Sequence, residues 1–366
     1  MRVALKECEW ETIGADLLVV FDAREAITLD DPEGHVAALL AELRRAPQTA
    51  AELSVSLQRR GIPLSEEDVG GGLTGLDSLG LVEDADGRTL GDLDEDERHF
   101  SNLSFYGTYS GLERRRAGFH RPLSEAHVLV LGVGGGGSSL VQCLAGLGVG
   151  ELTLVDQDRV ESRNFARQFL YHHADIGLSK AERAAAWVRD YDPRIKVRAA
   201  DRWVSAPEDL EDLIQGVDLV AGGLDGHPHA NLWANEAAVR NGVPYVLGGA
   251  NRSQLMYLSV DPGRTACLAC DYADRPVGDG PDAAAYRIVE NMKLSNPLTG
   301  PMAMQVGSLL ALEAQRYLTG YEPPRAAGHR VTLDLRTGLV PEWQPLPRNP
   351  GCQVCALAPA RESGRR

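Results

Sequence analysis

The chain has 366 residues, 43% of them hydrophobic, which is enough for one large or two modest globular domains. Asp and Glu outnumber Lys and Arg 52 to 37, and the net charge of −15 argues against broad binding to nucleic acid or to anionic membranes. No apolar run approaches the roughly 18 residues of a membrane span, and no apolar signal core opens the chain. We expect a cytoplasmic protein whose six cysteines form no disulfide framework.

The first 90 residues predict a small winged-helix-like module. A polar turn through Gly14 is expected to join its first two strands, and a Thr-x-x-Glu capping box at Thr49 opens its second helix. In chain order the pattern predicts strands at 3–5, 16–21 and 26–29, helices at 35–43, from 49 and at 66–79, and a hairpin from 80.

The function of this module is open to three interpretations. Its third predicted helix is acidic and lacks Arg and Lys, which argues against a winged helix that reads DNA. A structural or dimerisation appendage is the plainest alternative. The arrangement also resembles the PqqD-type peptide-recognition element, in which a leader peptide adds a strand to an exposed sheet edge. That resemblance implies that residues 1–90 are a leader-peptide recognition domain and that the partner is a ribosomal precursor peptide.

An acidic run separates this module from the rest of the chain. Residues 83–97 are rich in Asp and Glu, and we expect a solvated linker there. An aromatic, amphipathic stretch and the basic cluster 114–116 follow. We therefore assign residues 91–125 to an acidic linker with an aromatic and basic arm, and residues 126–366 to a second domain.

The second domain opens on a nucleotide-binding pattern. A short apolar strand at 128–131 runs into a series of glycines, and an apolar helix and the strand Leu152–Val155 follow. That strand ends on Asp156, 24 residues beyond Gly132, where a carboxylate can accept hydrogen bonds from ribose hydroxyls. The glycines let the backbone approach phosphates at a helix N-terminus. The pattern leaves the nucleotide open, since a dinucleotide dehydrogenase would also place an acid here.

Strands and helices alternate through the following hundred residues. The expected helices are 181–191, 210–214 and 230–241, and the expected strands are 195–198, 217–221, 244–249 and 255–260. This alternation predicts an α/β domain with a Rossmann-like, doubly wound and largely parallel sheet. The stretches 341–350 and 361–366, rich in Pro or Arg, are expected to be loose.

A cluster of polar side chains follows the second strand of the nucleotide pattern. It contains Arg163, Asn164, Arg167, Gln168 and Lys180. Three cations near one phosphate loop suit a triphosphate that is cleaved, because Arg and Lys neutralise the charge on leaving pyrophosphate. A nicotinamide enzyme needs no such cluster.

With these residues in place, the sequence resembles the ThiF/MoeB/HesA adenylating enzymes, which are related to the ubiquitin-activating enzymes. The resemblance covers about residues 98–356. The glycines from 132 to 137 meet the family's G-x-G-G-x-G, Asp156 stands eleven residues before Arg167, and Lys180 follows thirteen residues later.

Three further motifs carry the resemblance. Residues 164–168 meet the family's N-x-x-R-Q, and Asp225 falls on its magnesium-binding aspartate. Residues 296–320 match its helix with Gly followed six positions later by Glu. One position departs from the pattern: in the family's R-x-x-R-Q segment before the first strand, Ser101 replaces the second arginine, which leaves Arg98 and the cluster 114–116 as candidate substitutes.

The resemblance implies an enzyme that uses ATP and magnesium to adenylate the C-terminal carboxylate of a small protein or peptide, working as a homodimer. It implies catalytic roles for Arg167, Lys180 and Asp225, with Asp225 also holding magnesium. The implied nucleotide-binding residues are Gly132, Gly134, Gly135, Gly137, Asp156, Asp158, Asn164 and Gln168.

Four cysteines form two Cys-x-x-Cys pairs separated by 81 residues, namely Cys267, Cys270, Cys352 and Cys355. This arrangement predicts a closed, structural zinc site, whereas a redox centre needs only one pair. The polar segment 271–295 is positioned like the family's crossover loop over the substrate tail. Cys8 and Cys143 lie in a predicted strand and an apolar helix, so a thioester relay is not expected.

Both halves together favour an ATP-dependent adenylyltransferase of ribosomal peptide natural-product maturation, similar to enzymes of the microcin C type. The first alternative is a non-catalytic ThiF-like protein that binds a leader peptide for a separate cyclodehydratase. The second alternative is an activating enzyme for a ubiquitin-like sulfur carrier, which would leave the N-terminal module unexplained.

Overall fold

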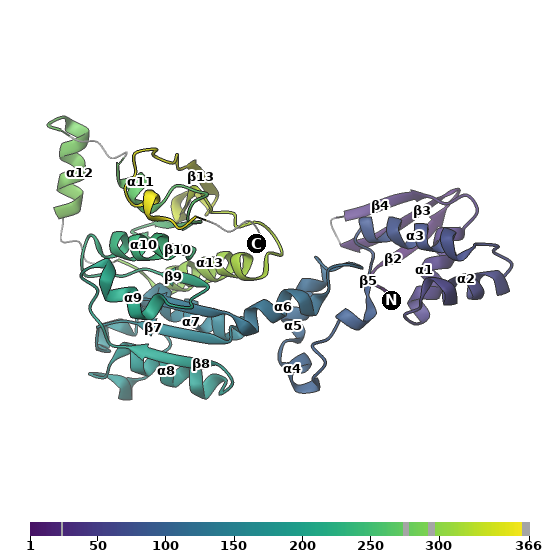
Figure 1. The fold of residues 1–366 in the computed structure, drawn as a ribbon, viewed down its shortest axis with the longest axis horizontal. Helices are drawn as coiled ribbons and strands as arrows, with labels where there is room; N and C mark the ends of the chain where they lie inside the picture. The colour runs from purple at the N-terminus through teal and green to yellow at the C-terminus, as the bar shows by residue number, and fades with distance from the viewer. Residues whose placement is uncertain (23–24, 274–277, 292–296, 361–366) are drawn as a thin grey trace. The chain divides into compact units, whose positions relative to one another are not determined.

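The computed structural model describes residues 1–22, 25–273, 278–291 and 297–360 (Figure 1). The chain forms two compact units, Met1–Arg121 and Pro122–Arg366. The loose end expected at 361–366 and parts of the expected segments 271–295 and 296–320 lie outside the described residues. In the described ranges no helix combines the length and the apolar character needed to cross a membrane.

The N-terminal unit packs two small sheets and three helices around one apolar core. A three-stranded antiparallel sheet has the order β2-β3-β4, and β1 pairs separately with β5. The core includes Leu17, Leu40, Leu53 and Leu73, which are almost completely buried. The elements are β1 (Val3–Leu5), β2 (Glu9–Ile13), β3 (Asp16–Asp22), β4 (Glu25–Asp30), α1 (His35–Arg45), α2 (Ala50–Arg59), α3 (Glu66–Ser78) and β5 (Val82–Asp84).

Two predictions about this unit are wrong. The first expected strand does not join the Asp16–Asp22 strand through Gly14; the turn at Gly14 connects β2 to β3 instead. The hairpin expected from residue 80 does not form either, because β5 pairs with β1. Strand β2 escaped notice because its sequence, EWETI, is mostly polar and exposed, with only Trp10 packed against the core. The capping box at Thr49 is confirmed.

The acidic run after β5 is not simply a solvated linker. Glu83 and Asp84 are buried. Glu83 accepts hydrogen bonds from Arg88 (2.7 Å), Arg116 (2.7 and 2.8 Å) and the Ser110 hydroxyl (2.6 Å). The expectation failed because two of these partners lie far along the chain. Farther on, the acidic residues open α4 (Leu93–Arg98), and α5 (Phe100–Gly107) and α6 (Arg116–Glu125) follow.

The C-terminal unit is built on an eight-stranded sheet of order β13-β12-β11-β10-β9-β6-β7-β8. The pairs from β10 through β8 are parallel, and the pairs from β10 to β13 are antiparallel. The predicted doubly wound α/β fold is confirmed. The strands are β6 (His127–Leu131), β7 (Glu151–Val155), β8 (Lys196–Ala200), β9 (Leu219–Gly222), β10 (Tyr245–Asn251), β11 (Gln254–Val260), β12 (His329–Asp334) and β13 (Pro341–Pro345).

The expectation of a loose stretch at 341–350 is wrong for its first half, because β13 pairs with β12. Both prolines of β13 lie at its ends, and the strand lies at the edge of the sheet, where a missing N–H donor is tolerated.

The helices of this unit are α7 (Gly135–Leu147), α8 (Lys180–Tyr191), α9 (Glu211–Ile214), α10 (Ala230–Arg240), α11 (Leu268–Ala273), α12 (Pro281–Asn291) and α13 (Gly300–Thr319). Ala234 and Ala237 of α10 pack into the core beside Leu129 and Leu131 of β6. Successive residues of a strand point to opposite faces of the sheet. Helices α7 and α13 pack against the face of the sheet opposite to α10.

Helices α7 and α13 approach each other closely through glycine. A Cβ on Gly307 would lie 2.5 Å from the carbonyl oxygen of Gly136 and 2.6 Å from the amide nitrogen of Leu140. Six positions later, the fully buried Glu313 accepts hydrogen bonds from Ser259 and from backbone amides at 325 and 326. The Gly-x-x-x-x-x-Glu pattern therefore serves packing: its glycine lets α13 reach α7, and its glutamate fastens α13 to the sheet.

Candidate active site

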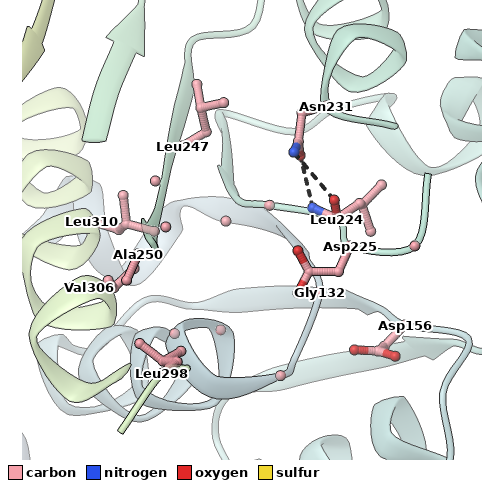
Figure 2. Close-up of a pocket in the computed structure, with 18 of the residues that line it drawn as sticks. Gly132, Asp156, Leu224, Asp225, Asn231, Leu247, Ala250, Leu298, Val306 and Leu310 are labelled. Carbon is pink, nitrogen blue, oxygen red and sulfur yellow. Dashed lines mark hydrogen bonds between the residues drawn. The ribbon is translucent and has the colours of Figure 1, made fainter. Parts of the chain in front are cut away.

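A cavity of about 810 Å³ opens at the carboxyl ends of β6 and β9. The chain runs from β6 to β7 on one side, while β9 pairs on the other side of β6, so the strand order reverses at this point. Open α/β sheets bind their ligands at such a switch point. Figure 2 shows the cavity, with Asp156 at one end and Leu247, Ala250 and Leu310 at the other.

At two positions of the loop that leads into α7, no residue other than glycine fits. Gly132 has φ 75°, and a Cβ there would lie 2.4 Å from the carbonyl oxygen of Gly223. A Cβ on Gly137 would lie 1.8 Å from the carbonyl oxygen of Gly132. At Gly134, by contrast, the nearest atom would be 3.6 Å away, which leaves room for a ligand. Gly135 is not among the residues that line the cavity; it packs towards Leu298 instead. The loop thus presents the N-terminus of α7 to the cavity, a position suited to phosphate.

Asp156 fastens this loop to the end of β7. Its two carboxylate oxygens accept hydrogen bonds from the amides of Val133 and Asp158, both at 2.8 Å. Burial raises the pKa of Asp156, and the hydrogen bond from Asp158 opposes that shift. Each carboxylate oxygen keeps a further lone pair. The predicted hydrogen bond to a ribose hydroxyl is compatible with this geometry and stays a prediction.

The three cations of the predicted cluster line the cavity, and Arg163 among them is paired with Glu161. Lys180 is buried, and its Nζ lies 2.9 Å from Oδ2 of Asp158. Arg167 is half-buried and donates to the carbonyl of Arg163 at 3.3 Å. Both side chains line the cavity, as does Asp225. The structure therefore brings together the three residues that the sequence assigned to catalysis.

The two predicted amides differ in how they are bonded. Oδ1 of Asn164 accepts a hydrogen bond from the amide of Glu161 at 2.8 Å, so this side chain closes the turn that carries the cations. Gln168 is also buried, yet its Oε1 has no hydrogen-bond partner among the described residues. An unpaired buried oxygen is costly, and a ligand or water in the adjoining cavity would satisfy it.

Asp225 lies in the loop after β9, between the two ends of the cavity (Figure 2). Its side chain lines the cavity, where the surrounding protein partly desolvates the carboxylate. This desolvation raises the pKa of Asp225, and the charges of Lys180 and Arg167 partly oppose the shift. A cation beside the carboxylate would favour its ionised form.

Asn231 holds the Asp225 loop in place, and sequence reasoning missed it. Its Oδ1 accepts from the amide of Leu224 at 2.8 Å, and its Nδ2 donates to the carbonyl of Leu224 at 3.3 Å (Figure 2). The Tyr245 hydroxyl also donates to Oδ1 at 3.4 Å. Asn231 could not be predicted from motif spacing, because it bonds the backbone N–H and C=O of Leu224 and no side chain of a recognised motif.

The end of the cavity opposite Asp156 is apolar. Its walls come from α13 and from the antiparallel pair β10–β11, and they include Leu247, Met256, Val306 and Leu310. An ion pair between Arg330 and Asp271 also lines the cavity. The cavity thus joins a charged compartment to a mainly apolar one that also contains the Arg330–Asp271 pair, with Asp225 between them.

The four cysteines of the two Cys-x-x-Cys pairs meet at one point. Their sulfurs all lie within 4.8 Å of one another, with 3.7 Å between Cys267 and Cys352 and 3.5 Å between Cys270 and Cys355. Tetrahedral zinc with Zn–S bonds of about 2.3 Å requires sulfurs about 3.8 Å apart. The backbone amide of Asn349 also points at Cys270 (3.4 Å). These residues fit a structural zinc ion, which would join α11 to the turn at Cys355–Leu357.

The remaining predicted groups lie elsewhere. Cys8 and Cys143 do not line the cavity, and burial raises the pKa of both thiols, which disfavours a thiolate. Arg115 and Arg116, candidate substitutes for the arginine missing at Ser101, are paired with Asp84 and Glu83 within the N-terminal unit.

The doubly wound sheet, the glycine loop, the acid at the end of β7 and the clustered cations define a nucleotide-binding α/β protein suited to a phosphorylated ligand. Residues 111–354 match the model of the ThiF family, and the chain belongs to that family. It is an adenylyltransferase of the ThiF/MoeB type, and ATP use goes with this family.

Curated relatives match about two thirds of the chain. The molybdopterin-synthase adenylyltransferase of Escherichia coli is 35% identical over 235 residues, which cover 64% of this chain and 88% of that protein. The SAMP-activating enzyme E1 of Haloferax volcanii is 30% identical over 64% of this chain and 81% of its own length. The chain spans only half of the adenylyltransferase and sulfurtransferase MOCS3 of Drosophila yakuba, at 31% identity.

Solved structures resemble the chain over nearly its whole length. Escherichia coli MccB with ATP superposes with a TM-score of 0.77 at 19% identity, covering 97% of this chain and all of that chain. PaaA superposes with a TM-score of 0.69 at 19% identity over 93% of this chain. The fold is therefore that of MccB. The PqqD-type assignment of the N-terminal unit stays a prediction.

Proposed function

We propose that this chain adenylates the C-terminal carboxylate of a ribosomal precursor peptide and that its N-terminal unit binds that peptide. The observation that carries the proposal is the two-compartment cavity, in which one end suits a nucleotide and the other suits the tail of an acyl substrate. The likeness to MccB supports it, because that likeness covers the N-terminal unit as well as the adenylating domain. MccB has been crystallised with its peptide MccA.

In this proposal the ribose of ATP binds at Asp156 and the phosphates lie along the glycine loop. Lys180 and Arg167 neutralise the triphosphate. Asp225 holds magnesium; this ion keeps several waters and is held by one or two carboxylates together with substrate phosphates, so a single aspartate between the compartments suffices. Magnesium would also offset the desolvation of Asp225.

The chemistry requires no general base, because a peptide carboxylate is already ionised at neutral pH. One carboxylate oxygen attacks the α-phosphorus, and the bond to the bridging oxygen breaks. The electron pair leaves with pyrophosphate, and an acyl-adenylate remains. Lys180 and Arg167 stabilise the charge that develops during this step. The proposal includes a homodimer, which light scattering of the purified chain would test.

Adenylation of a ubiquitin-like sulfur carrier is the second candidate. It is favoured by the names of the curated relatives, among them a sulfur carrier protein adenylyltransferase of Thermus thermophilus that is 31% identical. Those relatives align with about two thirds of this chain. The non-catalytic alternative is disfavoured, because the cavity retains Asp156, Arg167, Lys180 and Asp225.

Exchange of labelled pyrophosphate into ATP tests the proposal. Precursor peptides encoded beside this chain's gene should support exchange, and a small ubiquitin-like carrier ending in Gly-Gly should not. Asp225→Asn should abolish exchange while peptide binding persists. Asp190→Asn is the matched control, since Asp190 is exposed near the end of α8. Exchange with the carrier alone would reverse the assignment.

A further inference from the structure

A second large cavity lies wholly within the N-terminal unit, as a groove of about 760 Å³. Its walls are the chain from Ala4 to Glu9, the end of β3 and the last turn of α1. We call it the basic groove, because five basic but only two acidic side chains line it: Lys6, Arg44, Arg45, Arg88 and Arg116 against Glu7 and Glu9. Acidic residues outnumber basic ones in the sequence 1–121 as a whole, so the groove reverses the charge of its own unit.

The floor of the groove holds more positive than negative charge. Arg88 and Arg116 share the single buried carboxylate of Glu83. The Lys6 ammonium also lies here and donates to the carbonyl of Ser110, which carries no charge. Burial lowers the pKa of Lys6 despite the opposing charge of Glu83. Three cations thus face two carboxylates, Glu83 and the Asp77 whose charge also acts on Lys6, and a further anion in the groove would offset the remaining cost of burying them.

The shape and the other walls indicate what kind of anion fits. The groove is far larger than a single small ion, and exposed apolar side chains, Val20 and Phe21, stand beside the basic ones. Strand β2, which begins at the groove, is an edge strand that pairs only with β3 among the described strands. Basic and apolar walls next to an open strand edge suit an extended peptide with acidic and apolar side chains.

We propose that the basic groove binds an acidic segment of the peptide substrate. This inference rests on the proposed function, because it takes the ligand of the N-terminal unit to be a peptide. Lys6, Arg45 and Arg88 hold carboxylate side chains, and Phe21 packs against an apolar neighbour. The charge of the groove therefore selects among peptides by composition before adenylation occurs at the other unit.

Binding of labelled probe peptides to the full chain tests the inference. The probes are a fluorescein-labelled Gly/Ser peptide of about twelve residues with Phe and four Glu, and the same peptide with Gln or with Lys in place of Glu. Measured by fluorescence polarisation, the affinity of the chain for the Glu probe should be at least about fivefold higher than for the Gln probe. Added salt should reduce this difference in affinity.

A charge reversal separates recognition from folding. Arg45 is well exposed, and among the described residues its ion-pair partner is Glu42 of its own helix. Glu42 keeps its bonds to Arg60 and Ser56, so Arg45→Glu should leave the unit folded. This variant should bind the Glu probe about fivefold or more weakly than the wild type does, and it should bind the Lys probe more tightly. The control is Arg59→Gln, at an exposed position outside the groove, which should change neither. Equal binding of all probes, or no binding, overturns the inference.

The two proposals fail in different ways. If pyrophosphate exchange occurs with a precursor peptide but Arg45→Glu changes neither its KM nor probe binding, the groove is not the recognition site and the adenylation stands. If the probes behave as expected and no peptide supports exchange, the groove still binds acidic peptides, but the proposed function is wrong.

Discussion

The close approach of α7 and α13 gives a sharp prediction for Gly307→Ala. The new Cβ would meet the Gly136 carbonyl oxygen and the Ser139 hydroxyl at 2.5 Å and the Leu140 amide nitrogen at 2.6 Å. Two of these are backbone atoms that cannot rotate away, so the helices must separate. Overpacking of this kind costs about 3 kcal/mol at the upper end of its usual range. Alanine returns about 1 kcal/mol of helix propensity, which leaves a net loss of about 2 kcal/mol.

Thermal unfolding of the C-terminal unit measures this loss. About 2 kcal/mol corresponds to a Tm lower by roughly 4–8 °C for a unit of this size. Gly146→Ala is the matched control in α7, because its Cβ would lie 3.7 Å from the nearest atom, the Tyr191 hydroxyl. Its Tm should be unchanged or slightly higher. Because α7 also presents the glycine loop, Gly307→Ala should weaken ATP binding. Equal Tm values for the two variants would refute the packing argument.

Three further outcomes are expected. Asn231→Ala should lower the exchange rate by about tenfold or more by freeing the loop of Asp225, and it should also lower the Tm, because the buried backbone groups of Leu224 lose their partner; an unchanged rate would mean that the loop keeps its position without Asn231. Cys355→Ser should reduce the zinc measured by mass spectrometry from about one ion per chain towards none and lower the Tm; full zinc content in the variant would contradict the site. Burial alone would raise the pKa of Glu83, but the hydrogen bonds from Arg116 and Ser110 outweigh burial and lower this pKa. The wild type should therefore have a larger free energy of unfolding than Glu83→Gln. This difference should be full above pH ~4.3 and should shrink as the pH falls below that value.

The nucleotide end of the site could be predicted because its signals are local in sequence. At a position such as 132, where a Cβ would collide with the backbone, glycine is required, and the requirement can be read directly from the sequence. Asp156, Arg167 and Lys180 follow within one strand-loop-helix unit, so their spacing fixes their proximity. The cysteine cluster was predictable for a different reason: four thiols in two pairs have few other uses.

The features that escaped prediction depend on contacts between distant segments. Glu83 looks like part of a solvated acidic run until Arg116 is placed beside it, 33 residues later. The pairing of β1 with β5 joins the two ends of the N-terminal module, and neither three-residue strand has a period of its own. The basic groove collects cations from the residue after β1, from α1, from the segment after β5 and from the start of α6, which lie far apart in the sequence and meet only in the fold.

The most direct test of the central claim uses one precursor peptide in two forms, with a free C-terminal carboxylate and with a C-terminal amide. Adenylation requires a carboxylate oxygen as the nucleophile, so the free acid should support exchange of pyrophosphate into ATP and the amide should not. Both forms should bind the chain with similar affinity. Exchange that is equal with the two forms, or that is absent with the free acid although it binds, would contradict adenylation of the C-terminal carboxylate.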